Sequence, residues 1–219
     1  LNCEGGVVAV AGRGDVDEIP IRTSEQLDNV VAALYQRDPQ VAKYKTVVID
    51  GVSTMADRIL QEWIRRNTAR HTKKGKGNIE ADRTQDDVQR DDYGKALVQL
   101  RRIFGWYRDL PMHVICTALA KSVYPPNVTD TRAANPVEIR PLMTDSAGNS
   151  IMGMFDHVWY YDQVPGDATQ RYLITKRAGI YRAKTRGVYF PTALGGEQGY
   201  VMNPSLPAIG GSRPSRTAS

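Results

Sequence analysis

A short β-branched run, Thr46–Ile49, ends directly in Asp50 and restricts the chain to a small set of folds. A compact apolar run of this kind, flanked by polar residues, is typical of a parallel strand buried on both faces. A second buried run, His113–Ala118, follows a stretch with helical spacing. Strands that alternate with helices along the chain predict an α/β fold, in which helices flank a mostly parallel sheet.

Helical spacing fills the intervals between these strands. Thr23 has Gln26 three residues later, which fits a capping box at the start of a helix. The apolar stripes of three helices are formed by Leu27, Val30, Val31 and Leu34, by Met55, Ile59 and Trp63, and by Tyr93, Leu97, Leu100, Phe104 and Tyr107. Toward the C-terminus, His157–Tyr161, Arg171–Thr175 and Arg182–Tyr189 predict strands, the first two joined by a turn as an antiparallel pair.

Two long segments lack this regularity. Arg65–Asp91 has no apolar periodicity, and its basic first half and acidic second half predict a mobile insertion. Lys121–Asn149 carries several prolines and predicts a second mobile loop, of a length that is usually functional or disordered. Residues 202–219 are rich in Ser, Gly, Pro and Arg and predict a disordered tail. We therefore expect one core domain over residues 1–201.

The composition is that of a globular protein with a basic surplus. Apolar residues make up 41% of the chain and charged residues 24%, which excludes a disordered or collagen-like chain. The net charge of +5 favours a polyanionic partner, although a few extra surface cations would explain it equally well. Cys3 and Cys116 are the only cysteines, so we expect reduced thiols and a cytoplasmic location. No apolar run is long enough to span a bilayer, and no membrane partner is expected.

Several kinds of active site find no support in the sequence. The three histidines have no Cys or His at metal-ligand spacing, which argues against a zinc site. The sequence holds no Gly-x-Ser-x-Gly elbow of the α/β-hydrolases. No G-x-G-x-x-G follows a predicted strand, so a dinucleotide site is unsupported.

Three predicted strands instead end in polar residues, namely Glu4, Asp50 and Thr117. In open α/β sheets, sites form at the carboxyl ends of the strands. An ATPase needs a carboxylate to hold Mg²⁺, a second carboxylate to orient water, and a polar group to sense phosphate. Taken singly, Glu4 would usually be a solvated surface charge, Asp50 would more often be a helix cap or turn former, and Thr117 would more often be a satisfied core hydroxyl. Their order along the chain favours the ATPase.

Four blocks of the sequence resemble one family. They are residues 1–6 (LNCEGG), 46–50 (TVVID), 92–94 (DYG) and 109–118 (DLPMHVICTA). They look like successive blocks of phage AAA-type nucleotide-binding proteins, which resemble RecA and include the single-strand annealing ATPases of the Sak group. The resemblance covers most of the chain, as far as Gly199. It implies a RecA-like P-loop NTPase core with ATP and Mg²⁺ as cofactors.

The resemblance also implies roles for individual residues. Glu4 matches the catalytic glutamate, and Asp50 matches the Walker B aspartate that holds Mg²⁺. Thr117 matches the polar residue that couples the nucleotide to the DNA loops. Lys184 and Arg186 resemble a cation pair that reaches the ATP of a neighbouring subunit in a homo-oligomer, and residues two apart on a strand share a face. A basic edge strand that discourages aggregation is an equally good explanation of this pair.

One part of the family pattern is missing. No G-x-x-x-x-G-K-[ST] occurs in the sequence, although this Walker A loop supplies the backbone N–H groups and the lysine that hold the phosphates. In the family it lies upstream of the strand that corresponds to Leu1–Cys3. We therefore expect an N-terminally truncated ATPase core. This chain should hydrolyse ATP weakly or not at all, whereas the full-length protein should hydrolyse it.

RecA-like proteins contact DNA through two loops, which fall here at 65–91 and 121–149. Cations that track phosphates, with an aromatic ring for base stacking, suit single-stranded DNA. The candidate contacts are Arg65, Arg66, Lys73, Lys74, Lys121, Tyr124, Arg132 and Arg140. For the first loop, a solvated charge run is an equally good reading.

The resemblance thus implies an ATP-hydrolysing, RecA-like protein that acts on single-stranded DNA in phage recombination, annealing or replication. A phage single-strand binding protein would be a further partner, in the cytoplasm of the host. Two alternatives stay open. One is a non-catalytic DNA-binding or assembly module of the same fold, and the other is a helicase motor or loader.

Overall fold

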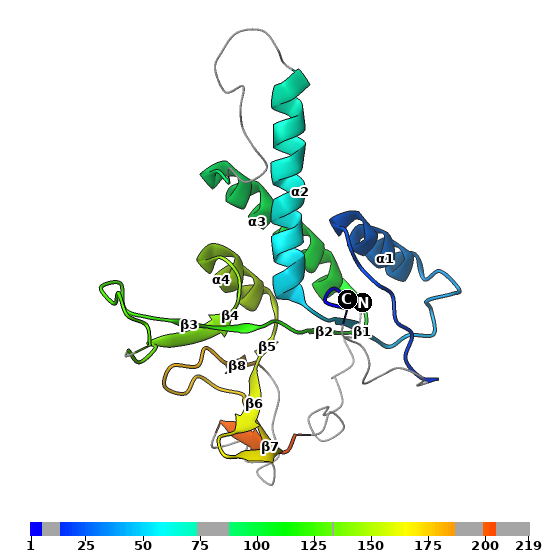
Figure 1. Ribbon diagram of the computed structural model, residues 1–219. Helices are drawn as coiled ribbons and strands as arrows, with labels where there is room; N and C mark the ends of the chain where they lie inside the picture. The colour runs from blue at the N-terminus through cyan, green and yellow to red at the C-terminus, as the bar shows by residue number, and fades with distance from the viewer. Residues whose placement is uncertain (6–13, 74–87, 133, 187–198, 205–219) are drawn as a thin grey trace. The chain divides into compact units, whose positions relative to one another are not determined.

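The computed structural model describes residues 1–5, 14–73, 88–132, 134–186 and 199–204, without the side chains of residues 67–73 (Figure 1). The chain divides into two compact units. The first contains residues 1–119 and 141–154, and the second contains residues 120–140 and those from 155 onward. The single core over residues 1–201 stays a prediction, and most of the tail from residue 202 lies outside the described residues.

The first unit contains a parallel strand pair. β1 (Thr46–Ile49) pairs in parallel with β2 (His113–Cys116), with Thr46 opposite His113. Asn2 extends the parallel arrangement on the side of β1 that does not face β2. It forms parallel bridges to Asp50, which follows β1, and to Pro20. Extended parallel segments thus lie side by side as the sequence predicts. A mostly parallel sheet is not seen among the described residues, where β1–β2 is the one parallel pair of strands.

The burial of β1 differs from the expected one. Val47 and Ile49 are buried, whereas the side chain of Val48 between them is 39% exposed. Because successive side chains of a strand point to opposite faces, one face of β1 is covered and the other is not. The prediction of a strand buried on both faces is therefore wrong for the described residues, although the bounds of the strand are confirmed.

Four helices belong to this unit: α1 (Ser24–Gln36), α2 (Val52–Lys73), α3 (Arg90–Asp109) and α4 (Asp145–Met154). The capping box at the start of α1 is confirmed, because Gln26 N donates to Thr23 Oγ1 and Thr23 N donates to Gln26 Oε1. The core of the three longer helices is made of Leu27, Val31, Met55, Ile59, Leu100, Ile103, Phe104 and Tyr107. Among these helices, α3 makes contact with each of the other three.

The structure corrects both predicted loops. α2 continues to Lys73 and α3 begins at Arg90, so the two ends of the predicted 65–91 insertion are helical, and residues 74–87 lie outside the described residues. Glu62 and Arg66, spaced four residues apart, form an ion pair where this polar end of α2 begins. Lys121–Asn149 contains all but the first residue of β3 (Ala120–Val123), all of β4 (Glu138–Pro141) and the first half of α4.

The hairpin-like pairing of β3 with β4 escaped prediction because its strands are short and interrupted by polar residues. Val137 N donates to Val123 O at 2.8 Å, which closes the pair at the end of β3. The prolines of this segment fall largely between the strands rather than within them, so they end the strands without preventing the pairing.

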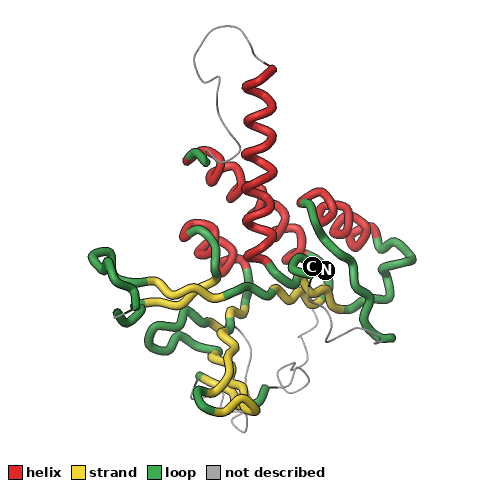
Figure 2. Tube along the Cα trace, in the orientation of Figure 1, coloured by secondary structure: helices red, strands yellow, loops and turns green. Residues whose placement is uncertain are grey.

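The second unit is built from antiparallel strands, as the sequence predicts. β6 (Tyr160–Val164) pairs with β7 (Asp167–Ile174), and β7 pairs with β9 (Tyr200–Met202) (Figure 2). The β6–β7 turn contains Gly166 with a positive φ of 82°. β5 (His157–Val158) pairs with β8 (Lys184–Thr185), which lies inside the strand predicted over 182–189. None of the described helices is long and apolar enough to cross a membrane.

Candidate functional site

The ends of β1 and β2 bring Asp50 and Thr117 into direct contact. Since Ile49 lies opposite Cys116 in the parallel register, the residues that follow them are neighbours at the same end of the pair. Thr117 Oγ1 donates to Asp50 Oδ1 at 2.5 Å. Gly51 N in turn donates to Thr117 Oγ1 at 2.9 Å. The hydroxyl therefore fixes the carboxylate on one side and is itself fixed by the backbone on the other.

Glu4 reaches the same place from the N-terminal segment. Asn2 bridges Asp50, and Cys3 N donates to Asp50 O at 2.9 Å, so the turn that begins at Glu4 leaves the sheet beside Asp50. Thr54 Oγ1, near the start of α2, donates to Glu4 Oε1 at 3.2 Å. The three strand-end residues of the sequence prediction are thus brought together at one rim of the first unit.

Asn2 is a positioning residue that the sequence reading missed. Its Oδ1 accepts from Glu4 N at 3.1 Å and from Gly5 N at 2.6 Å, while its Nδ2 donates to Glu18 Oε1 at 2.7 Å. Asn2 is only 8% exposed, so these hydrogen bonds are largely shielded from solvent. An Asn two residues before Glu-Gly-Gly is a signal for a side-chain-stabilised turn and could have pointed to it.

Gly51 is the second residue that was missed. Its φ is +95°, a conformation that residues with a side chain rarely adopt. A Cβ placed on it would lie 2.2 Å from Glu4 Cγ and 2.9 Å from Glu4 Oε1. Glu4 therefore lies directly over the bare backbone of Gly51, and the Asp-Gly pair after a buried strand was the available signal.

Among the described residues, this rim carries the carboxylates of Glu4 and Asp50 and the hydroxyls of Thr54 and Thr117, with the Asn2 amide beside them. Burial raises the pKa of Cys3, and it raises the pKa of Cys116 to about 12, so both thiols stay neutral at ordinary pH. Among the described residues, no group of three or more His, Cys, Asp or Glu could hold a metal ion. Mg²⁺ does not require such a cage, because it is usually held by one or two carboxylates together with phosphate oxygens and water. Asp50 and Glu4 fit that requirement.

The predicted cation pair lies in the second unit. Lys184 is in β8 opposite Val158, and Arg186 N donates to Asp156 O at 3.1 Å. Between them, Thr185 Oγ1 accepts from Trp159 Nε1 at 2.9 Å and donates to Thr175 O at 2.8 Å, which fixes the intervening side chain. Burial and then the charge of Arg186 lower the pKa of Lys184.

The first set of predicted DNA contacts lies on or beyond α2. Arg65 and Arg66 are exposed, and Arg66 Nη2 lies 3.6 Å from Glu62 Oε2. Lys73 is the last residue of α2, with its side chain outside the described residues, and Lys74 lies outside them altogether. Of these four predicted DNA contacts, the structure therefore describes the side chains of Arg65 and Arg66.

The second set lies in and around the β3–β4 pair. Lys121 and Tyr124 are half-buried, and Arg132 is exposed. Arg140 is different, because its side chain is only 9% exposed and Nη1 lies 3.5 Å from Glu138 Oε1. Arg140 therefore presents little of its charge to an outside phosphate.

Comparison with known proteins gives one match. A family model described as an AAA domain matches residues 1–187. The matched range contains Glu4, Asp50 and Thr117 of the first unit and Lys184 and Arg186 of the second. No curated protein and no solved structure matches the chain.

Proposed function

The chain belongs to the AAA domain family and is an AAA-type nucleotide-binding protein, and from this premise we propose that Glu4, Asp50 and Thr117 form the metal and water end of an ATP site. The observation that carries the proposal is the contact between the three strand ends. Thr117 bonds Asp50 at 2.5 Å, and Glu4 lies over Gly51, the residue that follows Asp50. Parallel pairing alone brings the ends of β1 and β2 to one rim, and the direct bond between the Thr117 and Asp50 side chains is the feature that goes beyond it.

In this proposal Asp50 would hold Mg²⁺, which would supply charge neutralisation on the phosphates. Thr117 keeps the Asp50 carboxylate in one orientation. Glu4 orients the attacking water, and Thr54 restricts the Glu4 carboxylate. Lys184 and Arg186 reach the ATP of a neighbouring copy in a homo-oligomer, which is the function that the resemblance implies for such a pair.

Measuring ATP binding tests the proposed site without requiring ATP hydrolysis. The titration uses a fluorescent ATP analogue with and without Mg²⁺. Asp50→Asn is expected to remove the Mg²⁺-dependent part of binding, and Thr117→Val is expected to weaken it. Asp91→Asn, at an exposed position in the first turn of α3, is the matched control and should leave binding unchanged. Equal Mg²⁺-dependent binding by Asp50→Asn and the unchanged chain would refute the metal role.

The second part of the proposal concerns DNA. We propose that the protein acts on single-stranded DNA in phage recombination, annealing or replication, in the host cytoplasm and with a phage single-strand binding protein. The net charge of +5 and the exposed pair Arg65 and Arg66 support a polyanionic partner. Annealing of complementary oligonucleotides, measured with and without ATP, is the test. Absence of both annealing and single-strand binding would exclude it.

A second candidate is a non-catalytic DNA-binding module of the same fold. The printed sequence contains no G-x-x-x-x-G-K-[ST], the loop that supplies phosphate ligands in P-loop proteins. Single-strand binding that is insensitive to ATP and to Asp50→Asn would identify this candidate. ATP-driven unwinding of a duplex would instead identify a helicase motor or loader.

A further inference from the structure

One face of the β6–β7–β9 sheet in the second unit is largely aromatic (Figure 2). Residues directly opposite one another on antiparallel strands point to the same side of the sheet. Tyr160 lies opposite Ile174, and Ile174 lies opposite Tyr200. Tyr172, two residues before Ile174 in β7, lies opposite Met202. These five side chains therefore share one face, which we call the tyrosine face.

The opposite face of the sheet is buried at its centre. Leu173 and Val201, which lie opposite each other, are 6% and 1% exposed. The tyrosine face is more open, because Tyr200 and Met202 on its β9 side are each 43% exposed. An antiparallel sheet with one face on a core usually carries polar side chains on the other. Exposed apolar groups gathered on that face therefore indicate a surface that takes a ligand.

The β6 side of the tyrosine face is closed by the chain's own rings. Tyr181 packs on Tyr160 with 4.6 Å between the ring centroids, and Tyr172 lies 6.4 Å from Tyr160. The hydroxyl of Tyr160 also donates to Asp162 Oδ2 at 2.7 Å. These contacts make a rigid floor, beside which the exposed ring of Tyr200 is left for a ligand to cover.

Cations lie on the Tyr200 side of the face. Lys176 and Arg177 come shortly after the end of β7, and both are exposed. A Cβ placed on Gly199 would lie 3.4 Å from Lys176 Cβ, so the Lys176 stem passes against the residue that precedes Tyr200. Asp162 lies at the opposite edge, in β6. A negatively charged ligand is therefore favoured on the β9 side of the sheet.

The second unit as a whole carries a surplus of positive charge. Its described residues contain nine Lys or Arg and five Asp or Glu. Cations beside an exposed aromatic ring are the combination that binds single-stranded nucleic acid, because cations attract the phosphates and bases stack on the ring. An acidic protein partner would use the cations without needing the ring.

We propose that the tyrosine face binds single-stranded DNA, with one base stacked on Tyr200 and the neighbouring phosphates at Lys176 and Arg177. The base lies flat on the exposed ring and needs no hydrogen bond from it. Stacking accepts every base, so binding should show little sequence preference. This inference rests on the proposed DNA role and is independent of the ATP site.

Tyr161 provides the matched control for Tyr200. It lies opposite Leu173 on the other face of the same sheet and is 58% exposed. Tyr161→Leu therefore removes an exposed ring without touching the tyrosine face. Tyr200→Leu removes the stacking ring, whereas Tyr200→Phe keeps the ring and removes only its hydroxyl. Thermal unfolding of each variant identifies any that fails to fold.

The assay is fluorescence anisotropy of a labelled oligodeoxythymidylate with the full chain, without ATP. Tyr200→Leu is expected to weaken binding about tenfold or more, the range of one lost stacked base. Tyr200→Phe and Tyr161→Leu should bind as the unchanged chain does. Lys176→Gln should reduce the slope of log affinity against log salt by about 0.7, the value for one phosphate of a single strand. Lys45→Gln, at an exposed position in the first unit, should leave the slope unchanged.

Tryptophan fluorescence separates stacking from a merely structural role of the ring. Tyr200→Trp places an indole on the tyrosine face, and a base stacked on it should quench the added emission when the oligonucleotide binds. Tyr161→Trp should show no added quenching. If Tyr200 only supports the sheet, Tyr200→Leu lowers the Tm without changing the affinity, and neither tryptophan variant responds to DNA.

Three results would overturn the proposal. Unchanged affinity of Tyr200→Leu would do so while leaving the DNA role and the ATP site intact. Equal displacement of the oligonucleotide by poly-glutamate would point to an acidic protein partner, and equal displacement by duplex DNA would show that phosphates are bound without stacking. Absence of single-strand binding by the unchanged chain would instead refute the DNA role itself, and this inference with it.

Discussion

Replacing Gly51 with alanine should disturb both the backbone and the Glu4 carboxylate of the candidate ATP site. The backbone contribution comes from the φ of +95°, because a residue with a Cβ in the left-handed region costs roughly 1–2 kcal/mol. Alanine also lowers the conformational entropy of the unfolded chain, which offsets about 0.4–1 kcal/mol of this cost. We therefore expect a net loss of about 1 kcal/mol in the free energy of unfolding.

The second contribution is steric and concerns geometry more than stability. The new Cβ would lie 2.2 Å from Glu4 Cγ and 2.8 Å from Glu4 Cδ, so the Glu4 side chain has to rotate away. The rotation breaks the Thr54 Oγ1 bond to Glu4 Oε1. Any activity that depends on Glu4 should fall with Gly51→Ala by about as much as it falls with Glu4→Ala.

Thermal and urea unfolding measure the stability effect. For a chain of this size a loss of 1 kcal/mol lowers the Tm by roughly 2–4 °C. Gly105→Ala is the matched control, because its Cβ meets only Met154 Cε at an ordinary 3.6 Å and its φ is not positive. It should be neutral or slightly stabilising, by up to about 1 kcal/mol. A Gly51→Ala chain as stable as Gly105→Ala would show that this backbone argument is wrong.

Three further perturbations follow from the described contacts. Thr23→Ala removes the capping box of α1 and should cost about 1 kcal/mol in urea unfolding, whereas Thr23→Ser should cost little. Tyr107→Phe removes the buried phenol that donates to Leu27 O at 2.9 Å and should cost about 1 kcal/mol, with a larger loss contradicting a simple hydrogen-bond role. Burial raises the pKa of Cys116 to about 12 from its ordinary 9.0, so its contribution is complete below pH 9 and is lost as the pH rises toward 12. Cys116→Ala should flatten the fall in stability between pH 9 and 10, and an unchanged slope would speak against this burial.

The parts of the fold that could be predicted from the sequence depend on local patterns. Thr46–Ile49 is a strand with the predicted bounds, because four residues that include three β-branched apolar ones leave few other conformations. The Thr23 capping box is set by residues three apart. The meeting of Asp50 with Thr117 follows from parallel pairing, since the ends of neighbouring parallel strands lie at the same rim.

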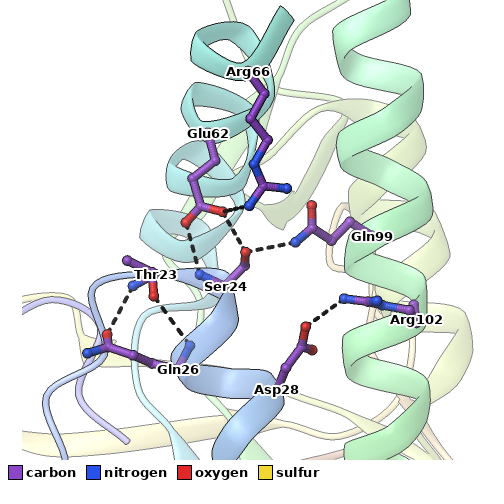
Figure 3. A network of polar contacts seen from close by, with 8 residues as sticks. All are labelled: Thr23, Ser24, Gln26, Asp28, Glu62, Arg66, Gln99 and Arg102. Atoms are coloured by element: carbon purple, nitrogen blue, oxygen red, sulfur yellow. Dashed lines mark hydrogen bonds and ion pairs between the residues drawn. The ribbon is translucent and has the colours of Figure 1, made fainter.

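The parts that could not be predicted depend on contacts between distant segments. The exposure of Val48 reflects which face of β1 the rest of the chain covers, and nothing in the run itself encodes that. The polar end of α2 has no apolar stripe, so it looked like a loop. Gln99 Nε2 donates to Ser24 Oγ, far away in the sequence, and Ser24 Oγ in turn donates to Glu62 (Figure 3). Periodicity carries no information about such a bond.

The place where the chain leaves the first unit has a mechanical consequence. Leu119, the last residue before the crossing, is tied by its N–H to Ser53 Oγ at 3.1 Å, and its carbonyl accepts from Leu142 N at 2.6 Å where the chain returns. Leu119 is therefore held by two hydrogen bonds at the end of the first unit, two residues after Thr117. The same backbone carries the Thr117 hydroxyl, so these bonds also help to keep the Asp50 carboxylate in its orientation.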